Sequence, residues 1–282
     1  MAKILVTGAT GTNGKALINK LRELQADYVV GTRNPNQASD LFKDSQIVAF
    51  DFANQSTYEN AVKDIDRVFL LGPPLTLKVD ELIFPFIDFL NEKGIKRVVY
   101  FSALQSDKMG GDIDFHQKVE QKLKKDEFDY TILRPTFFAQ NFKNYDYENI
   151  TERGIIYSVA GTGKAAFVDV LDIANVAATV LLNDGHSKKT YELTGDESFS
   201  FGDVATILSE ILDKKITYPN PSVTEFKEVL LQAGAPEFIA TYLIDVYSVI
   251  ANNEIDIISN DIEAITGKRP TPLKEVLQRD FK

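Results

Sequence analysis

Apolar residues in this chain alternate between short continuous runs and longer stretches with helical spacing. The runs predicted to be strands cover residues 4–7, 28–32, 46–50, 67–71, 97–101 and 130–133. Helical spacing fills the segments between them, as in Ala16, Leu17, Ile18 and Leu21 after the first run. Apolar strands separated by helices are typical of a parallel sheet that is covered on both faces. The pattern therefore predicts an α/β fold.

The alternation loosens after residue 135. Residues 137–142 form an aromatic segment that leads into another predicted helix. A short strand is predicted at 166–170, followed by a helix over 173–182 with Asp172 as its N-cap, since aspartate is a favoured N-cap residue. The later part of the chain is therefore expected to be less regular than the first.

The last predicted strand, residues 190–193, is expected to rejoin the sheet, and the chain from Ser200 onward is mostly helical in pattern. We therefore predict a Rossmann-type parallel sheet with helices on both faces, plus a smaller, mostly helical C-terminal domain. The first domain is expected to cover 1–135, with 158–195 returning to the sheet, and the second to cover 136–157 and 196–282.

The junction between the first strand and the first helix is rich in glycine. Its pattern is G-x-x-G-x-x-G, formed by Gly8, Gly11 and Gly14. Gly8 permits a tight turn, Gly11 lets backbone N–H groups approach a phosphate, and Gly14 lets the helix pack closely on the strand. With the next strand at 28–32, the turn completes a βαβ unit. It predicts a dinucleotide site, the alternative being an ordinary strand-to-helix loop.

The residue after the second strand indicates which dinucleotide binds. A carboxylate there would bind the ribose hydroxyls of NAD, whereas an arginine accommodates the 2′-phosphate of NADP. Arg33 occupies this place, and the next carboxylate is Asp40. Its planar donors match a phosphate. We therefore predict NADP(H), the alternative being that Arg33 is a solvated surface residue.

Composition excludes several classes of function. The 282 residues include 41 Asp and Glu against 31 Lys and Arg, and the resulting net charge of −10 argues against nucleic acid as a partner. There is no cysteine, and the two histidines, His116 and His186, lie far apart, so no metal site is expected. The absence of a membrane-length apolar run or a signal-peptide pattern leads us to expect a soluble, cytoplasmic protein.

Several motifs together resemble the NmrA-like group of atypical short-chain dehydrogenase/reductases. They are Gly8-x-x-Gly11-x-x-Gly14, Arg33, Asp51-Phe52, the segments 130–135 and 167–174, Leu193-Thr194-Gly195 and Gly267-Lys268-Arg269-Pro270. The resemblance runs nearly end to end. Within the group, His116-x-x-x-Glu120 followed by Tyr130-Thr131 is most similar to type 2 NAD(P)H:quinone oxidoreductases and triphenylmethane reductases. Other branches hold NADP-binding regulators and isoflavone-reductase-like enzymes.

The resemblance implies roles for individual positions. The implied cofactor-binding residues are Gly8, Thr10, Gly11, Thr12, Asn13, Gly14, Arg33, Asp51, Phe52, Leu71, Gly72, Pro73, Ser102, Pro135 and Phe137. The implied substrate-binding residues are Phe138, Asn141 and Phe142. Alternative explanations remain for three of these residues, because Phe52 and Leu71 could be core residues and Ser102 a cap.

The catalytic pair of typical short-chain dehydrogenases is missing. In the motif Tyr-x-x-x-Lys the tyrosine transfers the proton and the lysine lowers its pKa, but no tyrosine here has a lysine four residues later. His116 and Glu120 stand at the corresponding helix position, one turn apart. His116 could donate a proton near neutral pH, or hydrogen-bond the nicotinamide or ribose, with Glu120 orienting it. The alternative is a helix pair without a catalytic role.

Two functions follow from these observations. The first is an NADPH-dependent oxidoreductase that transfers a hydride to a quinone or another conjugated, electron-poor acceptor, with a small apolar or aromatic substrate. The second is a regulatory protein that senses NADP(H) without catalysis. The apolar stretch 238–250 could be core or a dimer face, so a homodimer is also open.

Overall fold

The computed structural model of the protein describes residues 2–76, 78–108 and 113–282. Contacts divide the chain into two units. The first consists of Met1–Met109, Asp114–Arg134 and Ile173–Glu192, and the second of Gly110–Ile113, Pro135–Asp172 and Leu193–Lys282. The chain thus leaves the first unit after Arg134, and returns to it at Ile173.

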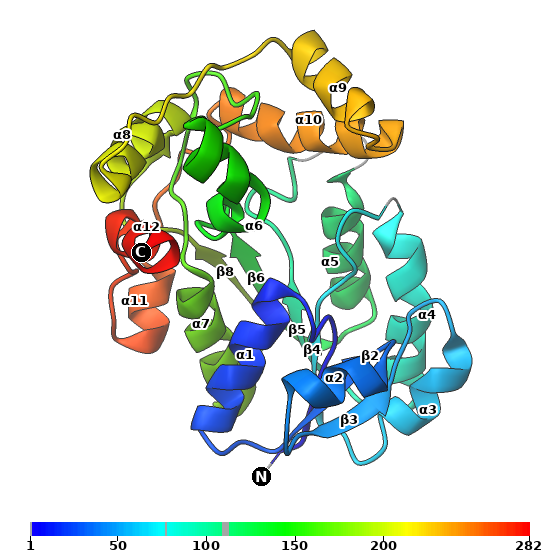
Figure 1. The fold of residues 1–282 in the computed structure, drawn as a ribbon. Helices are drawn as coiled ribbons and strands as arrows, with labels where there is room; N and C mark the ends of the chain where they lie inside the picture. Colours follow the sequence, from blue (N-terminus) through cyan, green and yellow to red (C-terminus); the bar gives the residue numbers. More distant parts are fainter. Residues whose placement is uncertain (1, 77, 109–112) are drawn as a thin grey trace. The chain divides into compact units, whose positions relative to one another are not determined.

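A seven-stranded sheet forms the centre of the first unit (Figure 1). Its strands are β1 (Ile4–Val6), β2 (Tyr28–Thr32), β3 (Gln46–Ala49), β4 (Arg67–Leu70), β5 (Arg97–Phe101), β6 (Asp129–Pro135) and β8 (Lys189–Leu193). The order across the sheet is β3-β2-β1-β4-β5-β6-β8, and the pairs from β3 to β6 are parallel. The predicted Rossmann-type α/β fold is confirmed, as is the return of residues 190–193 to the sheet.

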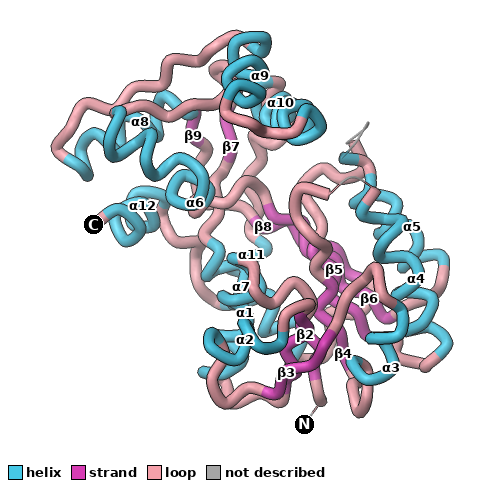
Figure 2. The backbone as a smooth tube through the Cα atoms, turned by 45° about the vertical axis from the view of Figure 1, so that its right-hand side comes forward, coloured by secondary structure: helices cyan, strands magenta, loops and turns pink. Residues whose placement is uncertain are grey.

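Helices cover both faces of this sheet (Figure 2). One face carries α1 (Thr12–Glu23) and α7 (Val170–Leu182), and the other carries α3 (Tyr58–Ala61), α4 (Val79–Glu92) and α5 (Phe115–Lys125). The short α2 (Pro35–Leu41) and a 3-10 turn at Gln55–Thr57 complete the unit. Burial on both faces explains why β1 is apolar throughout and why β4 and β5 are apolar after their first residues, Arg67 and Arg97, since neither side of these segments meets water.

Two arginines from the sheet hold the end of α7. Arg67 donates to the carbonyl of Leu181, and Arg97 donates to the carbonyl of Asn183. Arg97 also pairs with Asp184 at 2.7 Å. The last carbonyls of a helix have no partners within the helix, so the two guanidinium groups supply the donors that this helix end lacks.

The second unit is mostly helical. Its elements are α6 (Asn141–Glu148), a π-helical turn at Asn149–Arg153, α8 (Phe201–Leu212), α9 (Val223–Gln232), α10 (Glu237–Ala251), α11 (Asp261–Thr266), α12 (Leu273–Phe281) and a two-stranded sheet of β7 (Lys164–Ala165) and β9 (Phe199–Ser200). α10 buries Ala240, Val249 and Ile250, whereas Phe238 is 42% exposed. Among the described residues no helix is long and apolar enough to cross a membrane.

The predicted strand at 166–170 and the cap at Asp172 are wrong. Only Val168 makes a bridge, to Phe138, and α7 already begins at Val170. The carboxylate of Asp169, not that of Asp172, accepts the backbone N–H of Leu171. Asp172 instead accepts hydrogen bonds from the backbone and hydroxyl of Thr271, which lies 99 residues later.

Asp169 is the centre of a buried polar network in the second unit. Its carboxylate is 1% exposed and accepts two hydrogen bonds from Arg279 of α12, at 2.9 and 3.0 Å. Gln140 donates to the same carboxylate at 3.0 Å and accepts the backbone N–H of Val170. A buried carboxylate needs such partners, because it has lost its hydration. The network therefore fastens the last helix to the start of α7.

We expect Arg279→Met to destabilise the second unit. The change leaves Asp169 buried without its cation, and we expect a loss of about 1–2 kcal/mol, less than for a fully buried pair because Arg279 is partly solvated. Thermal or urea unfolding measures it. The control is Arg269→Met, which removes an 83% exposed side chain that lies 3.7 Å from Glu263. Equal effects of the two changes would contradict this assignment.

Candidate functional site

The candidate cofactor residues of the first unit gather at one edge of its sheet. Gly8 follows β1, Arg33 follows β2, Asp51 follows β3, Leu71 follows β4 and Ser102 follows β5. Because these strands are parallel, their carboxyl ends meet at the same edge. This is the edge at which open α/β sheets bind ligands.

The glycine turn has the backbone geometry that its sequence predicts. Gly8 has φ +62°, a conformation that favours glycine. A Cβ atom on Gly14 would lie 2.3 Å from the carbonyl oxygen of Gly8, so only glycine lets α1 start this close to the turn. A Cβ atom on Gly11 would meet only the Gly8 oxygen, at 3.4 Å. Protein packing therefore does not require glycine at position 11. The lack of a side chain on Gly11 instead lets a ligand approach its backbone.

The start of α1 is suited to an anion. Its N-cap is Gly11, no side chain caps it, and its first turn contains no acidic residue. Thr10 and Thr12 are exposed beside it. The oxygen Oδ1 of Asn13 is buried and has no hydrogen-bond partner among the described residues. Free helix N–H groups attract phosphate, and the Asn13 oxygen would accept a hydrogen bond from a ligand hydroxyl. The residues present fit the pyrophosphate of a dinucleotide.

Thr7, predicted only as the last residue of the first strand, joins the turn to the end of β4. Its hydroxyl accepts the N–H of Leu71 at 2.9 Å, and two acceptors for its single proton lie in reach, the carbonyl oxygens of Leu71 at 3.0 Å and of Phe69 at 3.1 Å. Leu71, Gly72 and Pro73 are half-buried. A Cβ atom on Gly72 would lie 2.8 Å from Val79, so packing on α4 accounts for this glycine without a ligand.

The side chains placed near the adenine end are accessible. Arg33 is exposed, and Phe52 is half-buried with its ring 4.8 Å from that of Phe50. The Asp51 carboxylate accepts the N–H of Ala53 at 3.0 Å, which fixes the turn after β3. Arg33 and Phe52 thus lie at the ends of neighbouring strands, as the resemblance implies. Their roles in binding stay a prediction.

His116 is half-buried and lies on α5, where its ring nitrogen Nδ1 is 2.9 Å from the hydroxyl of Tyr100. Burial lowers the pKa of His116 to about 4, with the charge of Glu120 opposing the shift. The ring is therefore neutral near pH 7. Burial also keeps the pKa of Tyr100 well above its usual value, so this phenol stays protonated. The pair is a hydrogen bond between two neutral groups.

Glu120 does not orient His116. Its oxygens accept hydrogen bonds from Ser102, Ser106 and Arg134. Burial by itself would raise the pKa of Glu120, but the hydrogen bonds from Arg134 and the two serines outweigh it and hold the pKa below its usual value. No local signal in the sequence indicates that Ser106 and Arg134 are partners of Glu120, because only the fold brings them together.

The candidate substrate residues belong to the second unit. Phe142 is 2% exposed and packs against Phe167 and Phe201, with ring centroids 5.2 and 5.4 Å away. Phe138 and Asn141 are half-buried. Packing therefore accounts for Phe142, whereas Phe138 and Asn141 keep accessible surface.

Further aromatic rings continue from this cluster. Phe137 is half-buried and lies 5.8 Å from Tyr247 of α10, and Tyr247 also contacts Phe201 and Phe226. Burial, then the charge of Asp146, raises the pKa of Tyr247 far above its usual value. The unit thus offers aromatic surface with protonated phenols, a type of surface on which planar apolar molecules stack.

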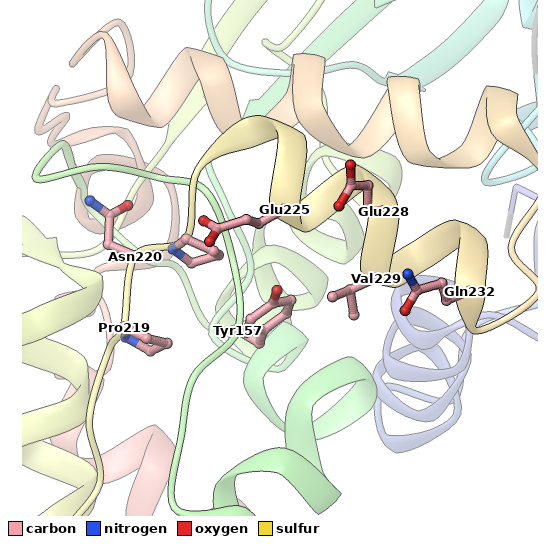
Figure 3. A pocket seen from close by; sticks show the side chains of 8 residues that line it. Tyr157, Pro219, Asn220, Glu225, Glu228, Val229 and Gln232 are labelled. Atoms are coloured by element: carbon pink, nitrogen blue, oxygen red, sulfur yellow. The ribbon is translucent and has the colours of Figure 1, made fainter.

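An open pocket of about 560 Å³ lies beside α9 (Figure 3). Its lining residues are Tyr157, Pro219, Asn220, Pro221, Glu225, Glu228, Val229 and Gln232. None of the predicted site residues lines it. Glu225 is already engaged in the capping box of α9 with Ser222. Within the described part of the chain, no group of three or more His, Asp or Glu residues could hold a metal ion.

Comparisons with known proteins indicate NAD(P)H as the cofactor class. Residues 8–184 match a family model described as NAD(P)H-binding. Festuclavine synthase II of Penicillium roqueforti is 30% identical over 287 residues, which cover 98% of this chain and 98% of that protein.

Solved structures extend the similarity to the whole fold. An NADPH-dependent quinone oxidoreductase of Escherichia coli, complexed with NADPH, has a TM-score of 0.89 at 27% identity and covers 99% of this chain and 100% of its own. The triphenylmethane reductase of Citrobacter sp., complexed with NADP(H), has a TM-score of 0.87 at 25% identity, with coverage of 99% and 100%. These similarities confirm the resemblance to the NmrA-like short-chain dehydrogenase/reductases that the motifs indicated.

We expect Arg33→Met to weaken NADPH binding at least about tenfold, because a charge-assisted hydrogen bond to a phosphate contributes about 1.5–3 kcal/mol. NADH lacks the 2′-phosphate, so its dissociation constant should not change. Fluorescence titration of both cofactors measures this. Arg22→Met, an exposed arginine on α1, is the control. Parallel losses for NADH and NADPH would refute the assignment of Arg33.

Asn13→Ala should weaken cofactor binding without destabilising the free protein. The change removes a buried oxygen that has no partner in the described structure, so the melting temperature without cofactor should stay equal or rise. The rise in melting temperature on adding NADPH should shrink, because the ligand contact is lost. Asn19→Ala, on the same helix, is the control. A lower melting temperature of the free variant would show that Asn13 is structural.

Proposed function

Because the chain belongs to the NAD(P)H-binding family and is an NAD(P)H-dependent oxidoreductase, we propose that it transfers a hydride from NADPH to a quinone or another conjugated, electron-poor acceptor. The first unit holds the cofactor at the carboxyl edge of its sheet. The glycine turn and the start of α1 bind the pyrophosphate, and Arg33 selects the 2′-phosphate. Bound NADPH supplies the hydride.

This proposal rests on the protonation states of two side chains at the position where a ketone reductase has its proton donor. It holds His116, whose pKa of about 4 leaves it neutral, and Glu120, which is ionised and engaged by Arg134. Neither group can give a proton readily near pH 7. A general acid contributes about 10²–10⁴ to a rate, so an acceptor that needs protonation during transfer would be reduced slowly.

Conjugated acceptors avoid this difficulty. A quinone spreads the incoming electron pair over its π-system and takes its proton from water afterwards, and a dye carbocation needs no proton. The protein then contributes proximity and orientation. The aromatic residues Phe137, Phe138 and Tyr247 of the second unit support this choice, because planar apolar rings stack on such side chains.

A screen of acceptors tests the proposal. NADPH oxidation is followed under anaerobic conditions with quinones, azo dyes, a triphenylmethane dye, imines, simple ketones and aldehydes. We expect turnover of the conjugated acceptors and rates for simple ketones at least about 100-fold lower, the size of a missing general acid. Tight NADPH binding with no turnover of any acceptor would instead favour the regulatory function. Faster reduction of simple ketones would contradict the proposed acceptor class.

The rate of quinone reduction should be nearly independent of pH between about pH 6 and pH 8. His116 has its pKa at about 4 and stays neutral throughout, and Glu120, with a pKa below its usual value, stays ionised. Steady-state kcat measured across this range with one quinone checks it. The control is a ketone reductase with Tyr-x-x-x-Lys, assayed in the same buffers. A kcat that falls tenfold across the range would mean that a proton donor exists.

A further inference from the structure

Glu120 is a heavily hydrogen-bonded carboxylate close to the carboxyl end of β5. It lies on α5 and is 1% exposed. Its Oε1 accepts from the hydroxyls of Ser102 and Ser106, both at 2.7 Å, and from Nε of Arg134 at 2.9 Å. Its Oε2 accepts from Nη2 of Arg134 at 2.7 Å. One side chain thus joins α5, β6 and the segment that follows β5.

Arg134 extends the connection to the far end of that segment. Its Nη1 donates to Asp107 at 3.0 Å, while its Nε and Nη2 make a bidentate contact with Glu120. The segment 102–107 is therefore held at Ser102, Ser106 and Asp107. Planar bidentate contacts fix orientation as well as distance, which a lysine cannot do.

The carboxylate also sets the polarity of the two serines. An ionised carboxylate only accepts hydrogen bonds, and each hydroxyl has one proton to donate. Ser102 and Ser106 both donate that proton in a hydrogen bond to Glu120. Ser102 can therefore only accept a further hydrogen bond, for example from the carboxamide NH₂ of a nicotinamide, and cannot donate to the carbonyl oxygen of an acceptor.

We propose that Glu120 and Arg134 are positioning residues for hydride transfer, which hold Ser102 and the 103–107 segment at the carboxyl end of β5 so that the nicotinamide half of the cofactor has a fixed support. The inference rests on the proposed function, because it concerns the same cofactor. It assigns a positioning role to Arg134. It also makes Arg134, and not His116, the partner of Glu120.

The charge of the pair maintains this arrangement. The titratable or charged groups around Glu120 are Arg134 and Tyr100 from neighbouring strands, Lys124 and His116 from its own helix, and Asp107 and Glu192 beyond Arg134. Only Arg134 makes a bidentate contact, and Lys124 is 3.5 Å away. Without Arg134, burial would raise the pKa of Glu120. A protonated Glu120 would donate a hydrogen bond and free a serine hydroxyl from its fixed orientation.

The test uses the nicotinamide fluorescence of bound NADPH, which needs no turnover, together with kcat for a quinone. In Arg134→Met we expect altered emission of bound NADPH and a kcat at least about tenfold lower, because small misplacements of reacting groups have effects of this size. The dissociation constant of NADPH should stay within about threefold, because the pyrophosphate and 2′-phosphate contacts are untouched. The emission of the variant should also become dependent on pH.

Two further variants control for stability. Lys122→Met removes another partly buried cation of α5, which pairs with Asp88 and Asp126 and does not touch the 102–107 segment. It should leave emission and kcat unchanged even if it lowers the melting temperature. Arg134→Lys keeps the charge but not the bidentate contact, and should have an intermediate effect on emission. If Arg134→Met does not fold, Arg134→Lys replaces it as the test variant.

The results separate this inference from the proposed function. Wild-type emission and kcat in folded Arg134→Met or Arg134→Lys would overturn the positioning role, as would a loss shared equally with Lys122→Met. If the wild-type protein reduces no acceptor, the proposed function fails, and the emission of bound NADPH still decides the role of Arg134. Glu120→Gln combined with Arg134→Met should remove the pH dependence of the emission, since the carboxylate that titrates is gone, and a pH dependence that persists in this double variant would contradict the role given to Glu120.

Discussion

The close approach of Gly14 to the carbonyl oxygen of Gly8 is the contact on which the first unit depends. It lets α1 begin directly above the end of β1, so that the uncapped start of the helix meets the carboxyl edge of a parallel sheet. The parallel pairing of β1 with β2 and β4 then brings the segments after those strands to the same edge. Thr7 fixes their spacing by its hydrogen bond to Leu71. A binding site for an elongated anionic molecule follows from backbone geometry before any charged side chain contributes.

The chemistry at the other end of this edge is set by charge. At the helix position where relatives with Tyr-x-x-x-Lys carry a cation, this chain has an anion, and it compensates with Arg134 from β6. The exchange turns a proton-transfer site into a set of fixed hydrogen bonds. A weak proton supply combined with fixed orientation would favour conjugated acceptors, as we propose.

Local signals in the sequence carry the prediction of the cofactor half of the site, whereas the partners of Glu120 depend on contacts between distant parts of the chain. The glycine turn could be recognised because the backbone requires glycine at Gly8 and Gly14, and Arg33 because it directly follows a strand. Glu120 was recognised, but its partners lie 14 and 18 residues away on other elements, so its spacing suggested His116 instead.

Long-range contacts also explain the errors in the second unit. The apolar residues before Asp169 resemble a strand, but Asp169 binds Arg279 from α12, and Asp172 binds Thr271. Both contacts cross about a hundred residues, and no periodicity in the local sequence reports them. The sheet, by contrast, was predictable, because burial on both faces leaves a continuous apolar run in the sequence of each central strand.

The return of the chain to its sheet has a consequence for synthesis. The strand order β5-β6-β8 means that the outer edge of β6 has no neighbour until residues 189–193 have left the ribosome. Until then the nascent chain carries an open sheet edge, and Arg67 and Arg97 lack the helix end that they hold in the finished protein. The first unit therefore completes late, by a contact between distant parts of the chain, and a fragment that stopped after β6 would be prone to pair edge to edge with its own copies.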